Sequence, residues 1–339
     1  MSGADAASVG HGGKRKHDEV APVWHTFAVS TSVGPRPTQE DRYIAVPNAW
    51  VEEAAATWPA CGFFGVFDGH RGHEAAEFVS RQLWVEVRRR LVALLHADSA
   101  TSAMPAPDAL EDAMLGAFAA TDAAVMETAG ESGSTATVVL LMGDGLCIAN
   151  LGDSKTVLCR SERCFWQTED HKPERPAERM RIVGAGGHVC TPHAAGEHNV
   201  PRLNGVLSVS RAFGDADFKR VAHDGAKAVD PQAGGGSGLS AEPDVTHRRL
   251  GDGRFGFRFD EFLLLASDGL WDVMSGDTAV EIARAELRKA KSQSRDVEGA
   301  LQQQVQSACD KLVSRAVQSG HCMDNVTVVL VMLSDTDDM

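Results

Sequence analysis

The spacing of hydrophobic residues divides the chain into helical and extended segments. Apolar side chains recur every three or four residues in 74–96 and along one face of 296–318, which is the period of an amphipathic helix. Residues 108–128 and 277–290 predict two more helices. Short continuous apolar runs predict buried strands, which lie at 63–67, 135–142, 146–151, 156–159, 262–266 and 326–332.

The order of these elements indicates the fold class. Strands come first, followed by two helices, many strands, two more helices and a closing strand. Strands and helices do not alternate one for one, as they would in a doubly wound parallel sheet. The sequence therefore predicts an α+β protein in which the sheets are mainly antiparallel and the helices are segregated from them.

Some segments differ in composition from the rest of the chain. Residues 1–22 are small and polar and predict a disordered tail, and residues 336–339 form a short tail at the other end. Residues 222–240 are rich in glycine and serine and predict a flexible loop. No linker divides 23–335, which we expect to form a single domain. The basic cluster Lys14–Lys16 is either a nuclear signal or an ordinary solvated charge run.

Charge and composition narrow the class of function. The 339 residues include 47 acidic and 33 basic side chains and carry a net charge of −14, whereas a general nucleic-acid binder needs a basic face. We find no apolar run long enough to span a membrane and no apolar signal core at the N-terminus.

The seven cysteines form no CxxC pair, which indicates reduced thiols in a cytoplasmic or nuclear protein. Without an oligomerisation stripe, a monomer is expected.

Acidic residues lie beside the ends of the predicted buried strands. The run FFGVFDGH at 63–70 passes from core residues directly to Asp68, and other acids occupy similar places beside strands or turns, namely Glu40, Asp153, Asp268 and Asp324. A single acid in such a place is an ordinary turn residue. Several acids around one apolar core repel one another unless cations lie among them. Their oxygen atoms suit a pair of Mg²⁺ or Mn²⁺ ions that acidify a water.

An arginine and a histidine near these acids fit phosphate chemistry. Arg36 lies four residues before Glu40, where its guanidinium can clamp two phosphate oxygens, although a surface arginine fits the same position. His70 lies two residues after Asp68 and can give a proton to a leaving oxygen. The alternatives for His70 are an ordinary turn residue and a metal ligand.

Nine segments in order match a known family. The chain resembles the metal-dependent protein serine/threonine phosphatases of type 2C over about residues 24–333, nearly everything except the N-terminal tail. The matching segments are RPTQED at 36–41, FFGVFDGH at 63–70, GSTAT at 133–137, ANLGDSK at 149–155, TEDHKP at 168–173, RLNGVLSVSRAFGD at 202–215, EPDV at 242–245, ASDGLWDV at 266–273 and DNVTVVLV at 324–331.

The resemblance implies a fold and an activity. The fold is a four-layer α-β-β-α sandwich, with two stacked and mainly antiparallel sheets flanked by helices and a metal cleft where strand ends meet. Residues 23–335 would be the catalytic domain, with the 222–240 loop beside its flap segment. The activity is hydrolysis of phosphoserine and phosphothreonine in protein substrates by a hydroxide that bridges two metal ions, with no phosphoenzyme.

The resemblance also implies roles for individual residues. Arg36 would bind the phosphoryl group, and His70 would be the general acid for the leaving group. Two Mg²⁺ or Mn²⁺ ions would share Asp68, and a third, weaker ion would lie beside them. The implied ligands are Asp68, Asp268 and Asp324 for the first ion, Glu40, Asp68 and the Gly69 carbonyl for the second, and Asp153, Asp268 and Asp272 for the third.

The chain departs from the family pattern beside this site. Arg71 replaces the usual glycine after the DGH motif, and His73 adds a second imidazole. Arg71 lies beside the predicted cleft, where it either touches substrate or is an ordinary solvated arginine.

Other function classes remain as alternatives. A cysteine-based phosphatase built on Cys322 would need an arginine six residues later, and position 328 is valine. A metal-dependent nuclease shares the two-ion chemistry but needs a basic groove. A catalytically weak pseudophosphatase that acts as a binding scaffold would have lost a ligand, whereas the four acids of the first two ions are all present.

Overall fold

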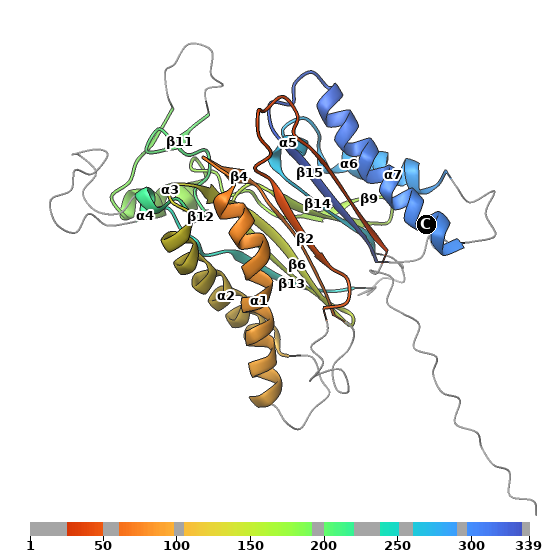
Figure 1. Cartoon of the computed structure of the whole chain (residues 1–339), viewed down its shortest axis with the longest axis horizontal. Coiled ribbons are helices and arrows are strands. Elements are labelled where there is room, and N and C mark those ends of the chain that lie inside the picture. Colours follow the sequence, from red (N-terminus) through yellow and green to blue (C-terminus); the bar gives the residue numbers. More distant parts are fainter. Residues whose placement is uncertain are drawn as a thin grey trace, which may run out of the picture.

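The two large sheets of the protein lie face to face. We describe the fold from a computed structural model (Figure 1). The structure describes residues 26–49, 61–97, 105–191, 200–219, 238–250, 260–289 and 297–333. The predicted tails at 1–22 and 336–339, and the 222–240 loop up to residue 237, lie outside the described residues.

Each large sheet has five strands in the described part of the chain, and all neighbouring strands pair antiparallel. The first sheet has the order β13 (Asp244–Arg249), β7 (Gly145–Leu151), β6 (Ala136–Met142), β3 (Cys61–Phe67) and β2 (Arg42–Val46). The second has the order β1 (Phe27–Ser32), β15 (Val326–Met332), β14 (Asp260–Ala266), β8 (Lys155–Arg160) and β9 (Arg163–Gln167).

Long helices cover the outer face of each sheet. Helices α1 (Glu74–Ala97) and α2 (Pro107–Thr128) share a hydrophobic core with the first sheet, and α6 (Gly276–Leu287) and α7 (Val297–Gln318) share one with the second. Figure 1 shows the two helix pairs on opposite sides of the paired sheets. The predicted four-layer α-β-β-α sandwich is therefore confirmed.

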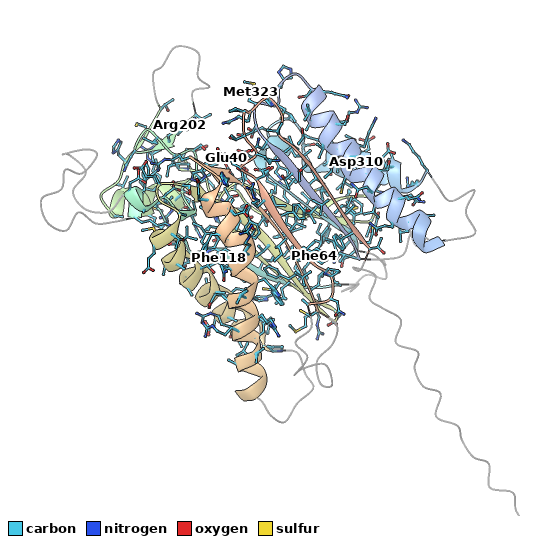
Figure 2. All side chains as sticks on the ribbon, in the orientation of Figure 1. Glu40, Phe64, Phe118, Arg202, Asp310 and Met323 are labelled. Atoms are coloured by element: carbon cyan, nitrogen blue, oxygen red, sulfur yellow. The ribbon has the colours of Figure 1, made fainter. Side chains whose placement is uncertain are left out.

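The continuous apolar runs of the sequence become strands that are buried on both faces. One face of each run packs against helices, and the other packs against the opposite sheet. Phe64 (Figure 2) belongs, with Leu263, to the layer between the sheets. Phe118 of α2 belongs to the core that α1 and α2 share with the first sheet. This double burial explains why these strands show no alternation of polar and apolar residues.

Short elements that the sequence analysis did not predict surround one end of the sandwich. They are β4 (Gly69–His70), β5 (Gly133–Ser134), β10 (Val189–Cys190), β11 (Arg202–Leu203), β12 (Phe213–Gly214), α3 (Pro176–Gly184), α4 (Ala216–Lys219) and α5 (Asp268–Trp271). The edge strands β9 and β13 were not predicted either, because they are only partly buried and carry polar residues. Within the described ranges, we find no helix with the length and apolarity that a bilayer crossing requires.

Candidate active site

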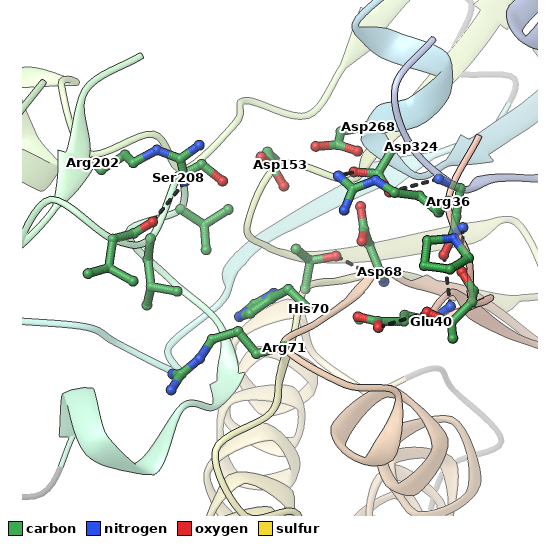
Figure 3. A pocket seen from close by; sticks show the side chains of 18 residues that line it. Arg36, Glu40, Asp68, His70, Arg71, Asp153, Arg202, Ser208, Asp268 and Asp324 are labelled. Carbon is green, nitrogen blue, oxygen red and sulfur yellow. Dashed lines mark hydrogen bonds and ion pairs between the residues drawn. The ribbon is translucent and has the colours of Figure 1, made fainter. Parts of the chain in front are cut away.

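A cleft of about 350 Å³ opens where strand ends of both sheets meet. Figure 3 shows acidic side chains along this cleft, with Arg36 and His70 near them. The cleft is lined by eight of the nine predicted site residues, namely Arg36, Glu40, Asp68, Gly69, His70, Asp153, Asp268 and Asp324. Asp272 does not line it but lies one helical turn after Asp268, whose carbonyl accepts a hydrogen bond from the Asp272 amide at 2.8 Å.

Three of the carboxylates form the centre of the cleft. Asp68 follows β3, Asp153 follows β7 and Asp268 begins α5 just after β14. One oxygen atom of each lies within 4.8 Å of the others. The Oδ1 atom of Asp268 is buried and has no hydrogen-bond partner among the described residues. The folded chain therefore gathers oxygen ligands without satisfying all of them.

The electrostatics of this cluster favour a cation. Burial raises the pKa of Asp68 well above its usual value, and the negative charges of Asp268, Asp41 and Asp153 raise it more. Burial likewise raises the pKa of Asp268, with added repulsion from Asp153 and Asp272. A divalent cation among these oxygens would remove the repulsion, so the donor set fits the hard metal ions predicted from the sequence.

Arg36 and Asp324 form an ion pair at the edge of the cleft. Arg36 Nη2 donates to Asp324 Oδ2 at 2.6 Å, and Arg36 Nε donates to the Met323 carbonyl at 2.7 Å. The Arg36 side chain remains 52% exposed. Burial raises the pKa of Asp324, while the Asn325 amide and the Arg36 charge act in the opposite direction.

Asn325 connects the loop that carries Arg36 and Glu40 to the start of β15. Its side-chain Nδ2 donates to the carbonyls of Val33 and Thr38, at 2.8 and 2.9 Å. Its Oδ1 accepts from the Glu40 amide at 2.8 Å. No local pattern in the sequence singles out Asn325 as a site residue, because its contacts join segments about 290 residues apart.

Gly69 allows the chain to pass close to the Glu40 backbone. A Cβ atom at position 69 would lie 2.5 Å from the Glu40 carbonyl oxygen. Next to it, the Asp68 amide donates to Thr135 Oγ1 at 3.2 Å, and the Asp68 carbonyl accepts from the Thr135 amide at 2.9 Å. Backbone contacts thus hold Asp68 and Gly69 close to Glu40, which are the residues predicted to bind the second ion.

His70 has a buried partner that the sequence analysis did not identify. Its Nε2 atom lies 2.6 Å from Asp215 Oδ2. Asp215 also accepts from Arg71 Nη1 at 3.3 Å, and Arg71 binds Asp217 at 2.9 Å. Arg71 is therefore not an ordinary solvated arginine, because its guanidinium donates hydrogen bonds to two aspartates. The family-matching segment RLNGVLSVSRAFGD ends with Asp215, but nothing in its spacing links Asp215 to His70.

A lysine lies beside the acids predicted to hold the third ion. Lys172 Nζ donates to Asp153 Oδ2. Burial lowers the pKa of Lys172, but the charge of Asp153, its hydrogen bond and the nearby Asp268 and Asp272 outweigh burial and raise the pKa. The Lys172 ammonium thus supplies positive charge where the weaker third ion was predicted.

The cysteine-based alternative does not fit the geometry. Cys322 is buried, and its Sγ atom lies 3.4 Å from the Asp324 carbonyl oxygen. Val328 lies within β15, paired with Ser30 and Ala266 of neighbouring strands. Because a phosphate-cradling loop cannot form inside a paired strand, Cys322 is not placed as a nucleophile.

Known protein sequences resemble this chain over most of its length. The protein phosphatase 2C family profile matches residues 28–326. Probable protein phosphatase 2C 71 of Arabidopsis thaliana is 32% identical over 313 residues, covering 90% of this chain and 55% of the relative. The chain thus spans about half the length of that relative. Probable protein phosphatase 2C 59 of Oryza sativa subsp. japonica is 31% identical, covering 100% of this chain and 84% of the relative.

Solved structures resemble the fold as well. The crystal structure of a serine-threonine phosphatase 2C from Toxoplasma gondii aligns with a TM-score of 0.69 and 26% identity, covering 91% of this chain and 94% of that one. A sex determining protein of C. elegans aligns with a TM-score of 0.67 and 25% identity, covering 92% and 65%.

Proposed function

Because the chain belongs to the protein phosphatase 2C family, a family of metal-dependent enzymes, we propose that it hydrolyses phosphoserine and phosphothreonine in proteins. The observation that carries this proposal is the meeting of Asp68, Asp153 and Asp268 within 4.8 Å, with Asp324 and Arg36 at the edge of the same cleft. Two further points stay predictions: the phosphoproteins that the chain acts on in the cell, and its location in the cytoplasm or nucleus.

The proposed ligands follow the three groups expected from the sequence. Asp68, Asp268 and Asp324 would hold one Mg²⁺ or Mn²⁺ ion, and Glu40, Asp68 and the Gly69 carbonyl a second. A third site would involve Asp153, Asp268 and Asp272, where Lys172 competes for the same oxygens. When bound, the ions activate the attacking water, so that no phosphoenzyme is needed.

The remaining steps belong to the chain's own residues. Arg36 offers donors in a planar fork that matches phosphoryl oxygens, and its exposed edge faces the cleft. His70 lines the same cleft and would give its proton to the serine or threonine oxygen as the phosphorus–oxygen bond breaks. Arg36 therefore orients the phosphoryl group, and His70 assists the departure of the serine or threonine hydroxyl.

The test is phosphate release from a phosphothreonine peptide with Mg²⁺, with Mn²⁺ and with EDTA. We expect release that requires metal and that falls to background in Asp68→Asn. This variant keeps the shape of the side chain and removes the charge shared by both ion groups. A circular dichroism spectrum and an unfolding curve check that the variant is folded.

A scaffold without activity is the alternative outcome. If the folded wild-type chain binds Mn²⁺ in a calorimetric titration but releases no phosphate, the hydrolytic function is wrong. Retained activity in Asp68→Asn would instead contradict the proposed ligand set.

A further inference from the structure

The small three-stranded sheet beside the cleft joins two segments that are far apart in the sequence. In β4 and β5, His70 pairs with Gly133, and Gly133 pairs in turn with Gly214 of β12. Asp215 is the next residue after β12. The sheet therefore brings His70 and Asp215 to the two sides of one glycine.

The contact between these two side chains is short and shielded. His70 Nε2 and Asp215 Oδ2 are 2.6 Å apart, and the Asp215 side chain is 0% exposed while that of His70 is 25% exposed. A Cβ atom on Gly133 would lie 2.3 Å from His70 Nε2 and 2.1 Å from Asp215 Oδ2. Only glycine at position 133 leaves room for the pair, so the contact depends on the sheet itself.

The backbone of Asp215 adopts a conformation that is uncommon for residues other than glycine. Its φ is +52°, in the left-handed region. The Asp215 amide donates to the Ser132 carbonyl at 3.0 Å, and the Asp215 carbonyl accepts from the Phe218 amide at 2.9 Å. Residues held in such conformations concentrate at functional sites, where the surrounding structure compensates for the strain.

The chemistry of the pair determines which nitrogen can act. A carboxylate only accepts hydrogen bonds, so His70 Nε2 carries the hydrogen that Asp215 accepts. We find no partner for the other ring nitrogen, Nδ1, among the residues that the structure describes. A ring held in this way can transfer a proton at Nδ1 while its Nε2–H stays bonded to Asp215.

We propose that Asp215 is a positioning residue, which fixes the ring orientation of His70 so that Nδ1 serves the leaving oxygen of the substrate. This inference rests on the proposed function, because it assigns a partner to the proposed general acid. Asp215 Oδ1 binds Arg71, so the buried carboxylate is hydrogen-bonded on its other side as well.

The test compares Asp215→Asn with wild type on two substrates. A phosphothreonine peptide has an alkoxide leaving group that needs a proton, whereas p-nitrophenyl phosphate has one that needs it much less. We expect kcat on the peptide to fall at least about 10-fold, a part of the factor that a general acid supplies. On p-nitrophenyl phosphate kcat should change less than about 3-fold, with Mn²⁺ affinity unchanged in a calorimetric titration.

Two controls separate positioning from general damage. Asp217→Asn removes another acid that Arg71 binds but does not touch His70, so both substrates should be hydrolysed at wild-type rates. In a His70→Ala background, Asp215→Asn should cause no additional loss on the peptide, because the group that it orients is already absent.

A second variant keeps the test decisive if Asp215→Asn does not fold. Gly133→Ala retains both side chains and pushes them apart, and it should reproduce the loss on the peptide alone. Gly184→Ala is its matched control, because a Cβ there meets nothing within 4 Å. Equal losses on both substrates, or none, would overturn the positioning role. An inactive wild type would overturn the proposed function itself.

Discussion

At the scale of the residue, Arg36 combines an ion pair with an exposed donor edge. Its Nη2 and Nε atoms bind Asp324 and the Met323 carbonyl, yet the side chain is 52% exposed and lines the cleft. A guanidinium has five donors, so Arg36 can keep these contacts and still bind phosphoryl oxygens.

Replacing Arg36 should therefore affect substrate binding first. We expect Arg36→Ala to raise KM for a phosphothreonine peptide by about 10- to 100-fold and to lower kcat less. This range corresponds to the roughly 1.5–3 kcal/mol of a hydrogen bond to a charged group. Arg36→Lys keeps the charge without the planar fork, so its KM should lie between those of the wild type and Arg36→Ala. Steady-state kinetics at saturating metal measure both constants, and a defect confined to kcat would contradict this role.

Most candidate residues could be predicted at this scale, but their partners could not. Asp68 stands directly after a buried apolar run and Asp268 stands two residues after one, so their place at strand ends is visible in the sequence. Asp215, Asn325 and Lys172 act through contacts with distant segments, and no local pattern records which segments meet. The family resemblance included all three in matching segments without assigning them a role.

At the scale of the element, the fold depends on strands that are buried on both faces. Their continuous apolar runs made β3, β6, β7, β14 and β15 predictable to within three residues at either end. The edge strands β9 and β13 and the two-residue strands were missed because their pairing is set by the rest of the molecule. The short sheet of β4, β5 and β12 has no hydrophobic pattern of its own and is formed only when its neighbours are in place.

The layer between the sheets should determine stability without affecting chemistry. Leu263 of β14 is 0% exposed and packs in this layer, paired with Val331 and Leu158 of the adjacent strands. Leu263→Ala should lower the free energy of unfolding by about 2–5 kcal/mol through lost burial and a cavity. At a temperature where the variant is folded, its kcat should stay near the wild-type value.

Urea unfolding and peptide hydrolysis on the same preparation measure both quantities. Val317→Ala is a suitable control, because Val317 on α7 is 38% exposed and its truncation should change stability little. A large loss of kcat in folded Leu263→Ala would show that the inter-sheet layer also sets the geometry of the cleft.

At the scale of the whole molecule, the sandwich brings like charges together from both of its sheets. Asp68 and Asp153 follow strands of the first sheet, whereas Asp268 and Asp324 flank strands of the second. Folding therefore concentrates negative charge in one cleft, which costs free energy unless cations bind there. The packing of the two sheets must outweigh this repulsion in the metal-free chain, so metal binding and fold stability should be coupled.

This coupling gives a definite pH dependence for the metal-free protein. Burial raises the pKa of Asp68, Asp268 and Asp324, and it raises the pKa of Asp41 to about 6 against the hydrogen bond from the Ser267 hydroxyl. A carboxyl group with a raised folded-state pKa favours the folded state below its unfolded pKa, near 4. Its contribution is lost as the pH rises through the folded-state value.

In EDTA, the free energy of unfolding should accordingly fall by at least about 1 kcal/mol between pH 5 and pH 7.5, as urea denaturation can measure. Asp268→Asn should flatten this slope, whereas Asp144→Asn, which changes a 58% exposed acid in the β6–β7 turn, should not. Mg²⁺ at 100 times its dissociation constant should restore about 2.7 kcal/mol at pH 7.5. A stability that stays level or rises over this pH range in EDTA would mean that the carboxylates do not repel one another as their burial implies.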